Sequence, residues 1–131
     1  MSSTPTVVVI DDDLSVRRSL DRLLVSAGYV VVACSSAHEF LALASLARPA
    51  CLVTDVRMPG MTGLDLLETI RVRGRDLPMI LSSGDGDAAT SAQARAGGAV
   101  RFLLKPFDSA DLLAAVEEAL DRDRASLARE S

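Results

Sequence analysis

The sequence predicts an α/β fold in which helices pack on a parallel β-sheet. Five short apolar runs alternate with five segments of helical spacing along the 131 residues. This alternation is typical of βαβ units, whose crossover helices return each strand in the same direction. The core must be aliphatic, because 49% of the residues are hydrophobic but only 3% are aromatic. The length suits a single domain.

The predicted strands are near-continuous in apolar character, which indicates strands that helices cover on both faces. They occupy residues 7–10, 30–34, 51–54, 79–82 and 100–104. Arg101 interrupts the last run. We therefore expect the fifth strand to lie at an edge of the sheet.

Helix signals separate the strands. The first helix has an apolar stripe that ends before Gly28, a residue suited to a left-handed helix end. The spacing of Ser36 and Glu39 matches a capping box that opens a second helix reaching Ala44. A third apolar stripe covers residues 64–70. We expect a helix at each of these three places.

The fourth helix, at residues 88–96, contains only small and polar side chains before Gly97 and Gly98. Little large apolar surface holds such a helix to the sheet. We therefore expect it to be the most mobile of the five.

Asp108 is placed to cap the fifth helix, whose apolar stripe covers residues 112–120. From residue 121 the sequence is highly charged and the stripe is lost. We expect the domain to occupy residues 1–120 and residues 121–131 to form a fraying helix end or an interdomain linker.

The composition disfavours two classes of partner. Eighteen acidic and fourteen basic residues give a net charge of -4, which argues against direct contact with nucleic acid. No apolar stretch approaches the roughly 18 residues that span a bilayer, so we expect a soluble, cytoplasmic protein without membrane contact. Cys34 and Cys51 lie inside apolar runs, which predicts reduced, buried thiols.

Polar side chains follow four of the five predicted strands. In an open parallel sheet, ligands bind outside the carboxyl ends of the strands. At those ends the chain places Asp11, Asp12, Asp13, Asp55, Ser83 and Lys105. Any one aspartate here could simply cap the next helix. We expect Asp13 either to cap that helix or to support the metal ligands without binding the metal itself. Helix capping does not account for the whole set.

Clustered carboxylates repel one another, and a divalent cation removes the repulsion. Mg²⁺ prefers hard oxygen ligands, which Asp11, Asp12, Asp55 and the backbone carbonyl of Arg57 could supply. Such a site suits phosphoryl transfer, which depends mostly on positioning and charge. Asp55 would be the nucleophile.

Lys105 and Ser83 complete this predicted site. Lys105 would offer a positive charge to one phosphoryl oxygen, and the Ser83 hydroxyl would donate a hydrogen bond to another.

Four segments together resemble the receiver domains of two-component response regulators. They are Val-Ile-Asp-Asp-Asp at 9–13, Asp-Val-Arg-Met-Pro-Gly-Met-Thr-Gly at 55–63, Ser-Gly at 83–84 and Lys-Pro-Phe at 105–107. The resemblance covers residues 5–121, and the sequence around Asp55 and at 83–87 is most similar to that of the FixJ-like subgroup. It implies a flavodoxin-like, doubly wound (βα)5 sheet with strand order 2-1-3-4-5.

The resemblance also implies roles for individual residues. Asp11 and Asp12 would be the metal-binding acid pair, and Asp55 would be phosphorylated in the presence of Mg²⁺. Ser83 would be the switch hydroxyl, and Lys105 would bind the phosphoryl group. Phe102 would be the switch aromatic, and the peptide between Lys105 and Pro106 would be cis.

Receivers of this kind take a phosphoryl group from a sensor histidine kinase and are switches rather than enzymes. The surface of helix four, strand five and helix five would then change its affinity for a partner. A phosphorylation-dependent homodimer and a following helix-turn-helix output domain are both expected, with a stand-alone receiver as the alternative.

The loop after Asp55 carries further expectations. Gly60 and Gly63 suit backbone that needs positive φ or close approach, and Pro59 stiffens the loop. Arg57 and Asp85 each lie two residues beyond a site residue. An ion pair between them would restrict the attacking water and tune the lifetime of the phosphoryl group.

Other functions share parts of this pattern. Residues 11–15 loosely fit the D-x-D-x-[TS] pattern of haloacid-dehalogenase hydrolases, with Asp11 as nucleophile, but this leaves Asp55 unexplained. A flavodoxin-like cofactor binder would need phosphate-cradling amides where this chain has three aspartates. A degenerate receiver that serves only as an interaction module is a third alternative, against which the intact site residues argue.

Overall fold

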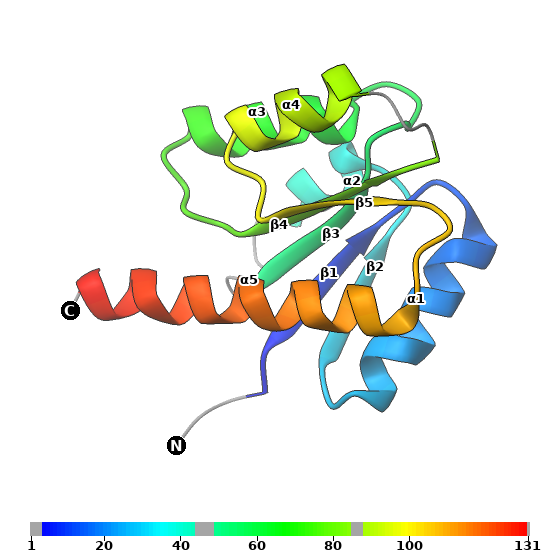
Figure 1. Ribbon diagram of the computed structural model, residues 1–131, viewed down its shortest axis with the longest axis horizontal. Coiled ribbons are helices and arrows are strands. Elements are labelled where there is room, and N and C mark those ends of the chain that lie inside the picture. Colours follow the sequence, from blue (N-terminus) through cyan, green and yellow to red (C-terminus); the bar gives the residue numbers. More distant parts are fainter. Residues whose placement is uncertain (1–3, 44–48, 85–87, 131) are drawn as a thin grey trace.

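A single five-stranded parallel sheet forms the centre of the molecule (Figure 1). The structure is a computed structural model that describes residues 4–43, 49–84 and 88–130, with side chains as far as residue 125. The strands lie in the order β2-β1-β3-β4-β5, which confirms the predicted fold and strand order. They are β1 Thr6–Ile10, β2 Val30–Cys34, β3 Cys51–Asp55, β4 Met79–Ser83 and β5 Arg101–Leu104.

Five helices cover the two faces of the sheet. They are α1 Leu14–Ser26, α2 Ala37–Leu41, α3 Gly63–Val72, α4 Ala88–Ala96 and α5 Ser109–Glu130. Figure 1 shows α1 and α5 on one face and α2, α3 and α4 on the other. The chain therefore winds along the sheet in both directions from β1. Because all the strands are parallel, their carboxyl ends meet at one edge of the sheet.

Each central strand supplies residues to two apolar cores, because successive side chains point to opposite faces. Val8 and Ile10 of β1 belong to the core beneath α2, α3 and α4. Val7 and Val9 belong to the core beneath α1 and α5. All four valine and isoleucine side chains are fully buried. This explains why the strand sequences are continuously apolar rather than alternating.

Helices pack on both faces of β2, as expected, but they bury this strand less completely than the central strands. This strand lies at one edge of the sheet, and Val30 is 48% exposed. Only Cys34 of its five residues is buried. The opposite edge is β5, as Arg101 predicted. The sequence of β2 is as apolar as that of β1, so its exposure follows from its place in the sheet.

The helix starts differ in detail from the predicted caps. Asp13 caps α1 as expected, because its carboxylate accepts hydrogen bonds from the backbone N–H groups of Ser15 and Val16. Ser36 caps α2, but the Glu39 carboxylate accepts from the N–H of Ser35 and not from that of Ser36.

The end of α2 differs from the prediction, and the start of α3 has a cap that was not predicted. α2 ends at Leu41, which is shorter than the predicted helix. A complete capping box, which the sequence reading missed, joins Thr62 and Asp65 at the start of α3. Thr62 therefore fixes the point at which the loop after Asp55 becomes helical.

The last helix extends beyond residue 121, and the expected domain boundary at residue 120 stays a prediction. α5 runs without interruption from Ser109 to Glu130, and Asp123 is only 7% exposed. Arg, Ala, Leu and Glu, which make up much of this stretch, all favour helix without requiring an apolar stripe. The segment 121–130 is thus a continuation of α5.

No helix in the described part of the chain is both long and apolar enough to cross a membrane.

Candidate phosphoryl-transfer site

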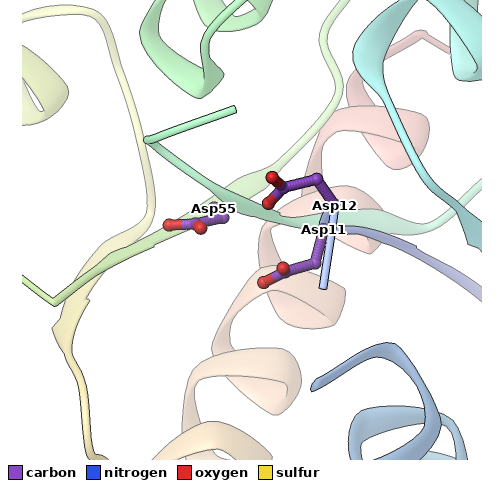
Figure 2. A group of neighbouring side chains, drawn as sticks. All are labelled: Asp11, Asp12 and Asp55. Atoms are coloured by element: carbon purple, nitrogen blue, oxygen red, sulfur yellow. The ribbon is translucent and has the colours of Figure 1, made fainter. Parts of the chain in front are cut away.

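Three carboxylates gather at the carboxyl edge of the sheet (Figure 2). Asp11 and Asp12 directly follow β1, and Asp55 is the last residue of β3, which is the neighbour of β1. One carboxylate oxygen from each residue lies within 4.8 Å of the others. Asp11 is buried, Asp55 is half-buried and Asp12 is exposed, so the cluster opens to solvent on one side.

Lys105 follows the edge strand β5, and its side chain reaches this cluster. Its ammonium nitrogen lies 3.1 Å from Asp11 Oδ2 and 3.5 Å from Asp55 Oδ2. The Lys105 backbone N–H donates to the carbonyl oxygen of Ser83 at 2.8 Å, which ties the end of β5 to the end of β4. The peptide between Lys105 and Pro106 is cis. Sheet topology thus brings together residues that lie 94 positions apart in the chain.

The charges of this cluster oppose one another. Burial raises the pKa of Asp55, Lys105 acts to lower it and Asp11 acts to raise it, and the net result lies above the ordinary value. Burial would lower the pKa of Lys105, but the negative charges of Asp11 and Asp55 outweigh it and raise this pKa. Burial thus disfavours the ionised form of Asp55, and the Lys105 ammonium offsets only part of this effect.

The loop after Asp55 is held close to it. The Arg57 backbone N–H donates to Asp55 Oδ1 at 3.4 Å, a long hydrogen bond. Gly60 has a φ of 77°, a conformation that favours glycine. A Cβ on Gly63 would lie 2.6 Å from the carbonyl oxygen of Asp55, closer than any side chain could approach. Gly60 thus meets the expectation of positive φ, and Gly63 meets that of close approach.

The donor set fits a divalent cation such as Mg²⁺. Asp11, Asp12 and Asp55 offer only hard carboxylate oxygens, and these converge from two strands. Within the described part of the chain, no hydrogen bond or ion pair involves the Asp12 carboxylate, so it can accept a cation without first losing a partner.

The remaining predicted residues lie around this cluster. Ser83 is the last residue of β4 and is buried. Phe102 is half-buried on β5, beside Leu81 of β4, and packs against the core beneath α4. Asp85 falls outside the described residues, so the ion pair with Arg57 stays a prediction. The mobility of α4 also stays a prediction. Ala94 is the one buried residue of this helix in the described part of the chain, which fits a weakly attached helix.

The structure adds one contact that sequence reasoning missed. Arg17, on the first turns of α1, donates from Nη1 to the backbone carbonyl oxygen of Asp11 at 2.8 Å. Its neighbour Arg18 is exposed. Two adjacent arginines look alike in the sequence, and only the helix phase decides which of them faces the end of β1.

Comparison with known proteins identifies the family. The sequence model of the response regulator receiver domain family matches residues 7–117. Nodulation protein W of Bradyrhizobium diazoefficiens is 44% identical over 94% of this chain, and FixJ of Azorhizobium caulinodans is 44% identical over 93%. The crystal structure of FixJ-N matches with a TM-score of 0.84 at 38% identity, covering 92% of this chain and 96% of that one.

The chain belongs to the response regulator receiver domain family, and these relatives support the FixJ-like subgroup. It spans 54% of the length of the nodulation protein and 58% of that of FixJ. The hydrolase alternative, with Asp11 as nucleophile, receives no support from this match. In the structure Asp11 is also buried and hydrogen-bonded to Lys105.

Proposed function

We propose that this chain is a phosphorylation switch in which Asp55 accepts a phosphoryl group from a histidine kinase. The observation that carries the proposal is the meeting of Asp55 with Asp11, Asp12 and Lys105 at one edge of the sheet. Asp11, Asp12, Asp55 and the backbone carbonyl of Arg57 would hold Mg²⁺. When bound, the cation supplies positive charge that the phosphoryl oxygens require.

The residues of the chain have distinct roles in this transfer. A carboxylate oxygen of Asp55 forms a bond to phosphorus as the phosphorus–nitrogen bond of the donor phosphohistidine breaks and its electron pair stays on the imidazole. The Lys105 ammonium exchanges its contact with Asp55 for one with a phosphoryl oxygen. The Ser83 hydroxyl, at the end of the neighbouring strand, donates to a second phosphoryl oxygen.

The response of the protein would arise from Ser83 and Phe102. Movement of the Ser83 hydroxyl toward the phosphoryl group leaves space beneath β5, and the half-buried Phe102 ring moves inward to fill it. The surface of α4, β5 and α5 then changes its affinity for a second receiver or for an output domain. The transcriptional role of FixJ, a relative of which this chain spans 58%, favours an output on DNA.

A protein donor has a surface on which to bind beside the site. A groove of about 580 Å³ lies between α1 and the start of α5, and Lys105, Pro106 and Phe107 line one end of it. Its lining is mostly apolar and includes Leu20 and Leu23. An exposed apolar groove beside Lys105 offers a contact surface to apolar side chains of a protein donor.

The test is intact-mass analysis after incubation with acetyl phosphate, with and without Mg²⁺. The parent should gain one phosphoryl group, and the gain should require both Mg²⁺ and Asp55, so that Asp55→Asn gains none. No gain in the parent would instead favour a degenerate receiver. A gain that survives in Asp55→Asn but disappears in Asp11→Asn would move the nucleophile to Asp11.

A further inference from the structure

We propose that Arg17 is a positioning residue for the acid pair: its guanidinium holds the peptide between Asp11 and Asp12 and thereby aims the Asp12 carboxylate at the cation site. The inference rests on the proposed function, because it assigns a residue that supports the same site. The contact that carries it is the hydrogen bond of 2.8 Å from Arg17 Nη1 to the carbonyl oxygen of Asp11.

Asp11 is restrained at every polar group. Its backbone N–H donates to the carbonyl oxygen of Cys34 on β2 at 3.1 Å. Its Oδ1 accepts from the N–H of Asp13 at 2.9 Å, and its Oδ2 accepts from Lys105 at 3.1 Å. Arg17 takes the one remaining group, the carbonyl. The peptide plane that leads into Asp12 is therefore fixed from the α1 side.

Within the described part of the chain, the Asp12 side chain has no such restraint of its own. Its carboxylate makes no hydrogen bond or ion pair with the described residues, and it is exposed. Its direction is set by the backbone that carries it, and the preceding peptide is the one that Arg17 binds. Residues that orient a ligand from behind, without touching the cation, commonly determine its affinity.

The place of Arg17 also argues for a role beyond helix stability. It is the fourth residue of α1, near the positive end of the helix dipole, where a cation is unfavourable. The acidic group at this helix start is the capping carboxylate of Asp13, which accepts hydrogen bonds from the backbone N–H groups of Ser15 and Val16. The bond from Arg17 to the Asp11 carbonyl gives this arginine a favourable partner at an otherwise unfavourable position.

The charge and the bond of Arg17 affect cation binding in opposite directions, which makes the proposal testable. A positive charge beside the site repels Mg²⁺, so removing charge alone should tighten binding. Removing the bond should weaken binding, because Asp12 loses its fixed direction. Arg18 provides the matched control, because it carries the same charge on the next residue of α1 and is exposed.

The experiment is titration of the isotope-labelled protein with MgCl₂, followed by amide NMR in the absence of any phosphoryl donor. Arg17→Met should raise the dissociation constant for Mg²⁺ about tenfold. Arg18→Met should leave it unchanged or slightly lower. Arg17→Lys keeps the positive charge and an N–H donor, so it should recover part of the lost Mg²⁺ affinity. Hydrogen exchange of the α1 amides measures whether each variant keeps its helix.

Each outcome decides the inference. Binding by Arg17→Met that is as tight as that of Arg18→Met would overturn it. A lysine variant that keeps α1 intact yet binds no better than Arg17→Met would also overturn it, because the loss would not depend on the donor. A parent that binds no Mg²⁺ overturns this inference together with the proposed cation site. A parent that binds Mg²⁺ but takes up no phosphoryl group refutes the transfer and leaves the role of Arg17 standing.

Discussion

Gly63 lies directly against the main chain of Asp55. A Cβ at position 63 would come 2.6 Å from the Asp55 carbonyl oxygen and 3.0 Å from Val56 Cα. Both neighbours are backbone atoms of a buried strand end, so neither can turn aside. The start of α3 and the end of β3 are thus packed at the distance that only glycine permits.

Gly63→Ala should therefore move Asp55 or the start of α3. We expect a loss of about 1–3 kcal/mol in the free energy of unfolding, as for other overpacked sites, and a slower phosphorylation by acetyl phosphate. Chemical denaturation and intact mass measure the two effects. Gly84→Ala is the control, because a Cβ there meets no atom of the described residues within 4 Å. Equal stability of the two variants would contradict this account of the contact.

Asp55→Asn should stabilise the protein in metal-free buffer at neutral pH. Burial and the charge of Asp11 raise the pKa of Asp55, so its ionised form costs stability, and this cost disappears as the pH falls through that pKa. The advantage of the variant should be present at neutral pH and should vanish in acid. Thermal unfolding at several pH values measures it.

Addition of Mg²⁺ should reverse this comparison. A cation that binds only the folded state raises the unfolding temperature of the parent more than that of Asp55→Asn, which has lost one carboxylate ligand. An identical shift in the two proteins would place the cation elsewhere.

The two thiols should be inert in the folded protein. Burial raises the pKa of Cys51 to about 12 and that of Cys34 to about 11. Since the thiolate is the reactive form, a disulfide reagent at about pH 8 should label neither residue until the chain unfolds, and Cys34 should react first as the pH rises. Absorbance of the released thiol measures the rate. A rapid phase in the native protein would contradict the burial of these residues.

Thr62→Ala should weaken the start of α3. The Thr62 hydroxyl accepts from the Asp65 N–H at 3.1 Å, and the Asp65 carboxylate accepts from the Thr62 N–H at 3.0 Å. Loss of such a cap costs about 1 kcal/mol of unfolding free energy. Thr69→Ala removes a hydroxyl from the middle of the same helix, where it donates to the Asp65 carbonyl, and should cost less. Urea denaturation of both variants compares the two losses.

The fold was predictable because the central strands are buried on both faces and leave a continuous apolar signal. Site candidates followed from the strand ends alone, since parallel strands end at one edge. The exposure of β2 was not predictable, because Val30 and its neighbours are as apolar as the residues of β1. The bond from Arg17 to Asp11 depends on helix phase and side-chain reach, and the continuation of α5 depends on propensity without an apolar stripe.

The strand order divides the site into parts of unequal resistance to local unfolding. Asp11 and Asp12 follow β1 and Asp55 ends β3, and both of these strands have neighbours on both sides. Lys105 follows β5, which pairs with β4 alone. Edge elements open at lower free energy than central ones. Mild destabilisation should thus release the lysine while the carboxylates remain together. Under the proposed function, such a weakened protein would still bind a divalent cation after Lys105 had lost its contact with the phosphoryl group.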